Sequence, residues 1–472
     1  MFSKLRTAGW VLLLAGAAGA CTVAAFGPGS TRDGRPMLWK NRDVTNPNQE
    51  FRLFAGGRFR FVANAYAGET TLVWAGINEA GFAIMNADAD NIGGFDLPGD
   101  DGQLMFNALG GCGSVDDFIA LLDSSGEVGR EWTANYGVFD STGRTAMFEV
   151  ANTWHVGYEA AEDTLGFIVR ANFAFAGDTN RRIGIDRFNR AFSLCTTARR
   201  GNRIDAEFVI NELARDVAQP DLDPYPLPFE GRYQGYPYGC LPTANALCRN
   251  TTRSVEVMVG PRPGEPAGTG MMWVLAGGPE VTAPIPLWVA AGRTPELLDG
   301  DSTSALCDSA IALRQANFPY EEWPRLVNTF SYVRIREALA PTESLVFELV
   351  RAETATWAPT GPTPGEASAL SDSCCALLLD GYARLSSQSG PPDRPQGIRP
   401  TVVENVLLLR FPAGVGRSQV FDAAGRRVAS VNGVPGGELR WDVRELAPGS
   451  YVVRFPDRPE AAPVRFVRAN RP

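Results

Sequence analysis

Short, largely apolar segments recur along the chain from residue 21 to residue 355. They are rich in β-branched and aromatic residues and are bounded by Gly, Asp or Asn, a pattern typical of β-strands. The predicted strands cover residues 37–41, 71–76, 82–86, 135–139, 145–150, 167–171, 254–260 and 272–276. Apolar positions at helical spacing predict helices over residues 115–122, 183–197, 205–217, 321–339 and 367–386. Strands with helices between them predict an α+β domain built on a largely antiparallel sheet.

The pattern changes after residue 387. Residues 388–400 include the run SGPPDRPQGIRP, whose proline and glycine content is typical of a linker between domains. Residues 401–472 contain only strand-like segments, at 406–411, 418–421, 426–431, 439–443 and 451–455. We therefore expect a large domain over residues 21–387 and a small all-β domain over residues 401–472.

Residues 1–20 have the composition of a signal peptide. Lys4 and Arg6 supply the positive start, residues 8–17 are apolar, and Ala18-Gly19-Ala20 is an A-x-A cleavage site. We expect cleavage after Ala20 and export to the periplasm or outer surface of a bacterium, as a secreted or cell-surface protein. The apolar run is too short to span a bilayer. A cysteine directly after the leader also suits a lipoprotein, although lipidation sites prefer Leu or Val where this chain has Ala18.

Charge and cysteine content narrow the choice of partner and chemistry. A net charge of −9 and a pI of about 5.0 argue against nucleic acid, because phosphate binding needs a basic face. The chain has 8 cysteines but only 1 histidine, His155, which has no evident Ser or Cys partner. Cys240 and Cys248 lie in a Gly/Pro-rich loop and form the best-placed disulfide pair in an exported protein.

Cys21 is the strongest candidate for catalysis. Cleavage after Ala20 would give Cys21 both a thiol and a free α-amine, whose pKa is about 7.7–8.0. Such an amine can act as the general base for the side chain of its own residue. This chemistry needs no catalytic histidine, which fits a chain with 1 histidine.

The segment from Cys21 to Asp43 resembles the start of two related families. These are the choloylglycine hydrolase/penicillin V acylase family and the acyl-coenzyme A:6-aminopenicillanic acid acyltransferase family. In both, a Cys-Thr start is followed by an Asp-Gly turn and a strand ending in an Arg-Asn-x-Asp motif, which here is Lys40-Asn41-Arg42-Asp43. Three further segments match in order: residues 76–86 ending in Asn86, residues 168–173 containing Asn172, and residues 186–191 containing Arg187. The resemblance covers residues 21 to about 355.

The resemblance implies a fold and a reaction. The fold would be the four-layer αββα sandwich of the N-terminal-nucleophile (Ntn) hydrolases. The reaction would be hydrolysis of a linear non-peptide carboxamide, such as an N-acyl amino compound, or transfer of its acyl group to an amine. The partner would be a small N-acyl amide, and no cofactor or metal is implied.

The resemblance also implies roles for individual side chains. The Cys21 thiolate would attack the amide carbonyl, and Asp43 would orient the Cys21 α-amine. The remaining roles are oxyanion binding by the backbone N–H of Asn86 and the side chain of Asn172, thiolate stabilisation by Arg187, and substrate binding by Lys40 and Asn41. Lys40 keeps the charge of the family's arginine but lacks its bidentate fork.

Residues 401–472 resemble a small immunoglobulin-like (Ig-like) sandwich of the kind found in C-terminal sorting domains of type IX secretion and in the flagellar-hook-capping repeat. The run from Asp422 to Val428 and the run from Leu446 to Val453 carry this pattern. The module is expected to contact the export machinery or a surface, and an inert accessory β-domain is the alternative. For the whole chain, the alternatives are a noncatalytic surface lipoprotein anchored through Cys21 and an ester or thioester hydrolase on the same scaffold.

Overall fold

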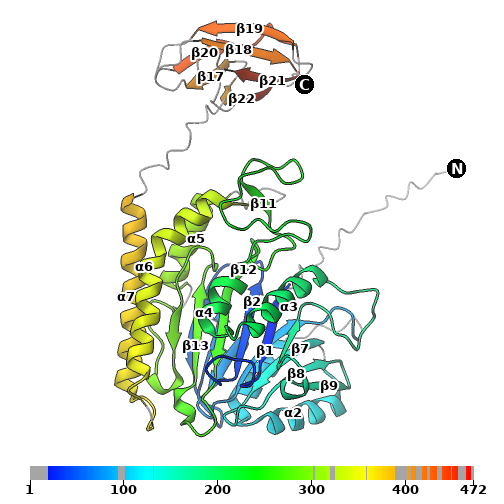
Figure 1. The fold of residues 1–472 in the computed structure, drawn as a ribbon, viewed down its shortest axis with the longest axis vertical. Helices are drawn as coiled ribbons and strands as arrows, with labels where there is room; N and C mark the ends of the chain where they lie inside the picture. Colours follow the sequence, from blue (N-terminus) through cyan, green and yellow to red (C-terminus); the bar gives the residue numbers. More distant parts are fainter. Residues whose placement is uncertain are drawn as a thin grey trace, which may run out of the picture. The chain divides into compact units, whose positions relative to one another are not determined.

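The structure is a computed structural model (Figure 1). It describes residues 20–93, 101–130, 132–300, 303–318, 325–357 and 359–388, together with residues 401–403, 406–410, 417–422, 426–432, 438–447, 449–454 and 464–468. The chain divides into two compact units, Met1–Leu385 and Ser386–Pro472. Residues 389–400 of the predicted linker (388–400) and leader residues 1–19 lie outside the described residues, and Gln388 is helical.

Two antiparallel sheets form the centre of the first unit. One sheet has the strand order β10-β1-β2-β12-β13-β14, and the other runs in chain order from β3 to β9. The strands of the first sheet are β1 (Thr22–Phe26), β2 (Met37–Asp43), β10 (Phe167–Arg170), β12 (Thr252–Val259), β13 (Met271–Ala276) and β14 (Ile285–Leu287). Those of the second are β3 (Gln49–Phe54), β4 (Phe61–Tyr66), β5 (Ala75–Asn78), β6 (Ala83–Asp88), β7 (Ala134–Phe139), β8 (Thr145–Val150) and β9 (His155–Glu159).

Helices cover the outer faces of both sheets. They are α1 (Asp101–Gly111), α2 (Val115–Val128), α3 (Ile185–Arg200), α4 (Ala206–Phe208), α5 (Ala305–Asn317), α6 (Thr329–Thr354) and α7 (Pro364–Gln388), with a π-helical turn at Val209–Leu213. Short 3-10 turns occur at Ala160–Glu162, Ala267–Thr269 and Val289–Ala291, and a two-stranded sheet joins β11 (Cys240–Pro242) to β15 (Leu326–Asn328).

The packing gives four layers. Phe118 of α2 packs on Phe82 and Phe148 of the second sheet, with ring centroids 6.1 and 5.5 Å apart. Phe347 of α6 packs on Trp273 of the first sheet at 5.2 Å. Between these helix layers, β1 contacts β7 and β2 contacts β6, so the two sheets face each other. The predicted α+β class is confirmed, and the layer order is helix, sheet, sheet, helix.

Most predicted strands match observed ones, and the misses have local causes. Residues 71–76 are mostly loop, with β5 beginning only at Ala75. β1, β3, β4, β9 and β14 were not predicted; β3 and β4 carry buried polar residues, such as Gln49 and Asn64, which weaken the apolar signal of a buried strand. The predicted helix 205–217 is a short α-turn followed by a π-helical turn, and the helix predicted over residues 321–339 begins at Thr329 in the described residues.

The predicted Cys240–Cys248 disulfide is wrong. All 8 cysteines are unpaired thiols. Cys248 is buried with its sulfur 3.7 Å from a Glu280 carboxylate oxygen. Cys240 instead lies in β11, where it pairs with Asn328 of β15.

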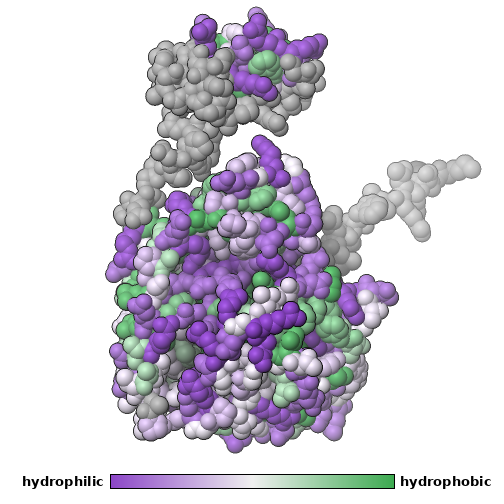
Figure 2. Space-filling model, in the orientation of Figure 1, coloured by the Kyte–Doolittle hydropathy of each residue, from purple (hydrophilic) through white to green (hydrophobic). Residues whose placement is uncertain are grey.

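No helix in the described part of the chain is long and apolar enough to cross a membrane. The face of the first unit in Figure 2 is largely hydrophilic, with hydrophobic residues scattered over it.

A buried ion pair fastens α6 to the segment after the π-helical turn. The Arg215 guanidinium binds the Glu343 carboxylate through two nitrogens, both at 2.8 Å, and Arg336 binds the same carboxylate. Burial opposes ionisation of Glu343, but the charges of Arg215 and Arg336 outweigh it and lower the pKa of this carboxyl to about 2.

This ion pair predicts acid sensitivity. A lowered folded-state pKa adds stability above the unfolded-state pKa of about 4.3, and that stability is lost as pH falls from about 5 to 2. We expect Glu343→Gln to lower the free energy of unfolding at pH 7 by about 3 kcal/mol. The free energy of unfolding of this variant should also depend less on pH between about pH 5 and 2. Chemical denaturation across pH measures both effects. Glu348→Gln, an exposed carboxylate on the same helix, should behave like the wild type.

From residue 401 onward, the described helices and strands of the second unit are all strands. β16 (Thr401–Val403), β17 (Val406–Arg410) and β20 (Glu438–Asp442) form one sheet. β19 (Arg427–Asn432), β18 (Arg417–Asp422), β21 (Gly449–Arg454) and β22 (Val464–Arg468) form the other. All five predicted strands of this module overlap observed ones, while its Ig-like identity and its role in sorting stay predictions.

Candidate active site

Cys21 directly precedes β1, the second strand in the order of the first sheet. β1 runs between β10 and β2, with Val23 opposite both Arg170 and Lys40. Side chains alternate along a strand, so Cys21 and Val23 point to the same face as Lys40. Lys40 bonds to Trp74 and Asn86 of the second-sheet segment, which identifies that face as the one between the sheets.

The thiol is in an environment that keeps it protonated. Cys21 is 5% exposed, and burial raises the pKa of its thiol to about 11. The charge of Lys40 opposes this rise, whereas Asp88 and Asp43 add to it. With Ala20 still attached, the thiol is therefore neutral near pH 7 and needs a base before it can attack.

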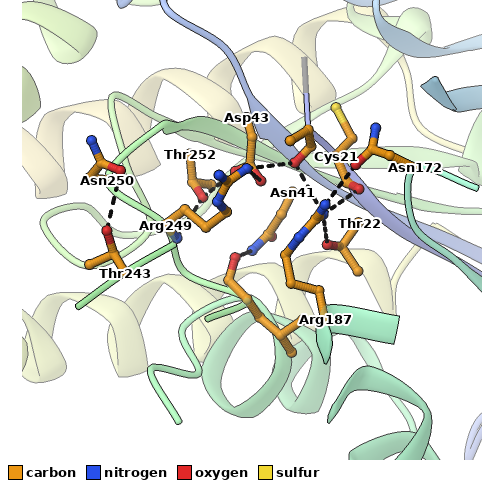
Figure 3. A network of polar contacts seen from close by, with 12 residues as sticks. Cys21, Thr22, Asn41, Asp43, Asn172, Arg187, Thr243, Arg249, Asn250 and Thr252 are labelled. Atoms are coloured by element: carbon orange, nitrogen blue, oxygen red, sulfur yellow. Dashed lines mark hydrogen bonds and ion pairs between the residues drawn. The ribbon is translucent and has the colours of Figure 1, made fainter. Parts of the chain in front are cut away.

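Arg187 connects the residues around the Ala20–Cys21 peptide bond (Figure 3). From α3, its Nη1 donates to the carbonyl oxygens of Ala20 at 3.2 Å and Cys21 at 2.6 Å, and to the Thr22 hydroxyl at 2.7 Å. Its Nη2 donates to Oδ1 of Asn172 at 2.7 Å. Burial lowers the pKa of Arg187 to about 10, which still leaves the guanidinium charged at neutral pH. We call Ala20, Cys21, Thr22, Asn172 and Arg187 the Arg187 network.

Asn172 lies directly beside Cys21. Extending the β1–β10 register by two residues from Val23 puts Cys21 opposite Asn172. Its Oδ1 accepts from Arg187, so the amide group is fixed in one orientation. Its Nδ2 lies 3.4 Å from the carbonyl oxygen of Asp88. Figure 3 shows this nitrogen on the same side as the Cys21 sulfur.

Asp43 is held by two residues to which the sequence pattern assigned no role. The Thr252 hydroxyl donates to one carboxylate oxygen at 2.5 Å, and Nη1 of Arg249 lies 3.2 Å from the other. The same Arg249 nitrogen is 3.4 Å from the carbonyl oxygen of Ala20. Burial raises the pKa of Asp43, and the charges of Arg249 and Arg187 oppose this rise. Thr252 reaches Asp43 because β12 pairs with β2, which places the two residues opposite each other.

Lys40 and Asn86 lie together because their side chains form a hydrogen bond with each other. The Lys40 ammonium donates to the carbonyl oxygen of Trp74 at 2.8 Å and to Oδ1 of Asn86. Nδ2 of Asn86 donates in turn to Asp101 at the start of α1. The Asn86 side chain is thus occupied away from Cys21, and the oxyanion role of its backbone N–H stays a prediction.

Asn41 points to the helix side of β2. Its Nδ2 donates to the carbonyl oxygens of Ala214 and Leu247, both at 2.9 Å, and its Oδ1 accepts from Trp39. The structure therefore does not bring this side chain to the thiol. It holds two loops against β2, and the geometry adds no support for substrate binding by Asn41.

Comparison with known proteins gives structural similarity alone. No family model and no curated protein matches this sequence. A variant of conjugated bile acid hydrolase from Clostridium perfringens matches with a TM-score of 0.36 at 13% identity, over 60% of this chain and 95% of that one. Penicillin V acylase from Agrobacterium tumefaciens matches with a TM-score of 0.34 at 15% identity, over 57% and 85%.

A third similar structure is the Caenorhabditis elegans orthologue of N-acylethanolamine-hydrolyzing acid amidase. Its TM-score is 0.36 at 12% identity, over 54% of this chain and 99% of that one.

Proposed function

We propose that this chain is an exported amide hydrolase whose nucleophile is Cys21, exposed as the new N-terminus by cleavage after Ala20. The Arg187 network is the observation that carries the proposal. One buried guanidinium fixes the backbone on both sides of the cleavage point and the amide of Asn172 beside it. A nucleophile and an oxyanion donor held by the same rigid group are what acyl chemistry requires.

Cleavage would supply the missing base. The buried thiol has its pKa raised to about 11 while the leader is attached, so it is not a thiolate at neutral pH. The α-amine of Cys21 would titrate at about 7.7–8.0 and could take the thiol proton. The Asp43 carboxylate, held by Thr252 and Arg249, would accept a hydrogen bond from the resulting ammonium.

The reaction then proceeds through a thioester. The thiolate attacks the amide carbonyl carbon, and the oxyanion is bound by Nδ2 of Asn172 and the N–H of Asn86, each donor contributing about 3 kcal/mol. The C–N bond breaks as the Cys21 ammonium protonates the leaving nitrogen. Water, deprotonated by the same amine, attacks the thioester and releases the carboxylic acid and the free thiol. An amine in place of water would accept the acyl group instead.

The first test is the intact mass and N-terminal sequence of the exported protein. We expect a free Cys21-Thr22 start, and a mass increase equal to the acyl group when a slowly turned-over N-acyl amide is added. Fragmentation should place that group on the Cys21 sulfur. A lipidated Cys21 amine, or a chain that begins beyond Cys21, would overturn the proposal, because the base or the nucleophile would be missing.

A further inference from the structure

Arg42 is a buried cation on the same face of β2 as Lys40. It is 1% exposed, and extending the β1–β2 register by one residue puts it opposite Cys21. Its guanidinium carbon lies 4.4 Å from the ring centroid of Tyr66 and 4.6 Å from that of Trp74. The two aromatic faces fix the plane of the guanidinium within the space between the sheets.

The charge of Arg42 has little polar compensation. Nη1 donates to the side-chain oxygen of Gln49, but Nη2 is buried without a hydrogen-bond partner. Within the described residues, no carboxylate lies within the 4.0 Å that defines an ion pair with Arg42. Buried charges in proteins are normally paired, because an unpaired one loses its hydration without replacement. The surroundings of Arg42 therefore lack an anion that would neutralise its charge.

The neighbours of Arg42 point to the same conclusion. Asn64 is fully buried, and neither its Nδ2 nor its Oδ1 has a hydrogen-bond partner. Nε1 of Trp74 is also buried and without a partner. Glu256 of β12 is a buried carboxyl near Lys40 and Arg42, and burial raises its pKa, with the charges of Lys40 and Arg42 opposing the rise. Burial therefore works against the ionised form of Glu256, which is the form that would neutralise Arg42.

We propose that Arg42 binds a carboxylate of the amide substrate, so that the enzyme acts on anionic N-acyl compounds. This inference rests on the proposed function. Directly opposed strand residues have Cβ atoms about 4.5–5.5 Å apart, so the carboxylate lies a few bonds from the carbonyl that Cys21 attacks. Nη2 of Arg42 donates to the carboxylate, and the Asn64 amide and the Trp74 indole N–H are further donors in reach of the substrate. The carboxylate belongs to either the amine part or the acyl part.

Two pairs of substrates test which part of the substrate carries the carboxylate that Arg42 binds. The first pair is an N-acylglycine and its methyl ester, which differ in charge on the amine part. The second is glutaryl p-nitroanilide and its methyl ester, which differ in charge on the acyl part. We expect the mature enzyme to have a higher kcat/KM for the acid than for the ester in one of the pairs. Arg42→Met should lower kcat/KM for that acid roughly 10- to 100-fold and should change kcat/KM for its ester little. Arg42→Lys should retain part of the preference.

Arg130→Met is the matched control. Arg130 is equally buried, but it donates to the carbonyl oxygens of Leu122, Ala151 and Trp154, far along the chain from Cys21. We expect this variant to melt at a lower temperature with an unchanged acid-to-ester ratio. Arg42→Met should melt at the same or a higher temperature, because it removes an uncompensated charge.

A binding measurement separates this inference from the proposed function. In a Cys21→Ala background, millimolar glutarate or N-acetylglycine should raise the melting temperature, and adding Arg42→Met should remove the increase. Stabilisation without hydrolysis of any amide would support the anion site and overturn the proposed function. Amide hydrolysis with equal rates for acid and ester, unchanged by Arg42→Met, would overturn the anion site and leave the proposed function standing. Neither hydrolysis nor stabilisation would overturn both.

Discussion

Replacing Cys21 with alanine is expected to lower kcat for amide hydrolysis by about 10⁴-fold or more, because the chain loses the atom that forms the acyl-enzyme. Cys21→Ser keeps the shape and the α-amine but presents a hydroxyl, a much weaker acid than a thiol. It should therefore retain only trace activity. Initial rates with an N-acyl amide and the mass of the trapped thioester measure the two effects.

Cys112→Ala is the matched control for this experiment. Cys112 is also a buried free thiol, but it belongs to the core between the second sheet and its helices. Its replacement should leave kcat unchanged. Equal losses in the two variants would show that thiol removal acts through stability, and full activity of Cys21→Ala would exclude Cys21 as the nucleophile.

Replacing Arg187 with methionine should have the second largest effect. Arg187 is 3% exposed, and its loss leaves the carbonyl oxygen of Cys21 and Oδ1 of Asn172 buried without their charged donor. We expect kcat to fall by about 10²–10³-fold, because the Asn172 amide is no longer held in its oxyanion-binding orientation. The free energy of unfolding should fall by roughly 2–4 kcal/mol. Rates and chemical denaturation measure these changes separately.

Two further variants test whether Arg187 acts by positioning. Arg187→Lys retains the charge but loses the fork that joins the Cys21 and Asn172 sides, so it should recover stability more than kcat. Arg190→Gln, on the same helix, breaks an ion pair with Asp216 outside the network and should leave kcat unchanged. If Arg187→Met lost no more activity than Arg190→Gln, the Arg187 network would have no part in catalysis.

Two buried cationic side chains on the strand next to Cys21 distinguish this site from the other buried thiols described. Lys40 and Arg42 follow each other on one face of β2, yet their surroundings differ. Lys40 has carbonyl and amide oxygens in contact, whereas Nη2 of Arg42 has no partner in the described residues. The predicted substrate-binding role of Lys40 therefore stays a prediction, and Arg42, two residues further on, is the cation with an unpaired N–H group.

The sequence by itself determined the elements whose signals are local. The β-rich composition of residues 145–150 and their flanking turn residues predicted β8 at its observed bounds, and the leader pattern singled out Cys21 as the candidate nucleophile. Motif order also singled out Asn172 and Arg187, which the structure places beside the Cys21 backbone, while their catalytic roles stay predictions. The strand prediction succeeds because it depends on a short run of residues.

The tertiary structure decided everything that depends on strand register and on which face a side chain occupies. Thr252 meets Asp43 across 209 positions of sequence, because β12 pairs with β2. Asn41 and Arg42 are adjacent in sequence but lie on opposite faces of one strand, so one holds loops and the other faces the space beside the thiol. A one-residue change of register would exchange these roles, and no local pattern specifies that register.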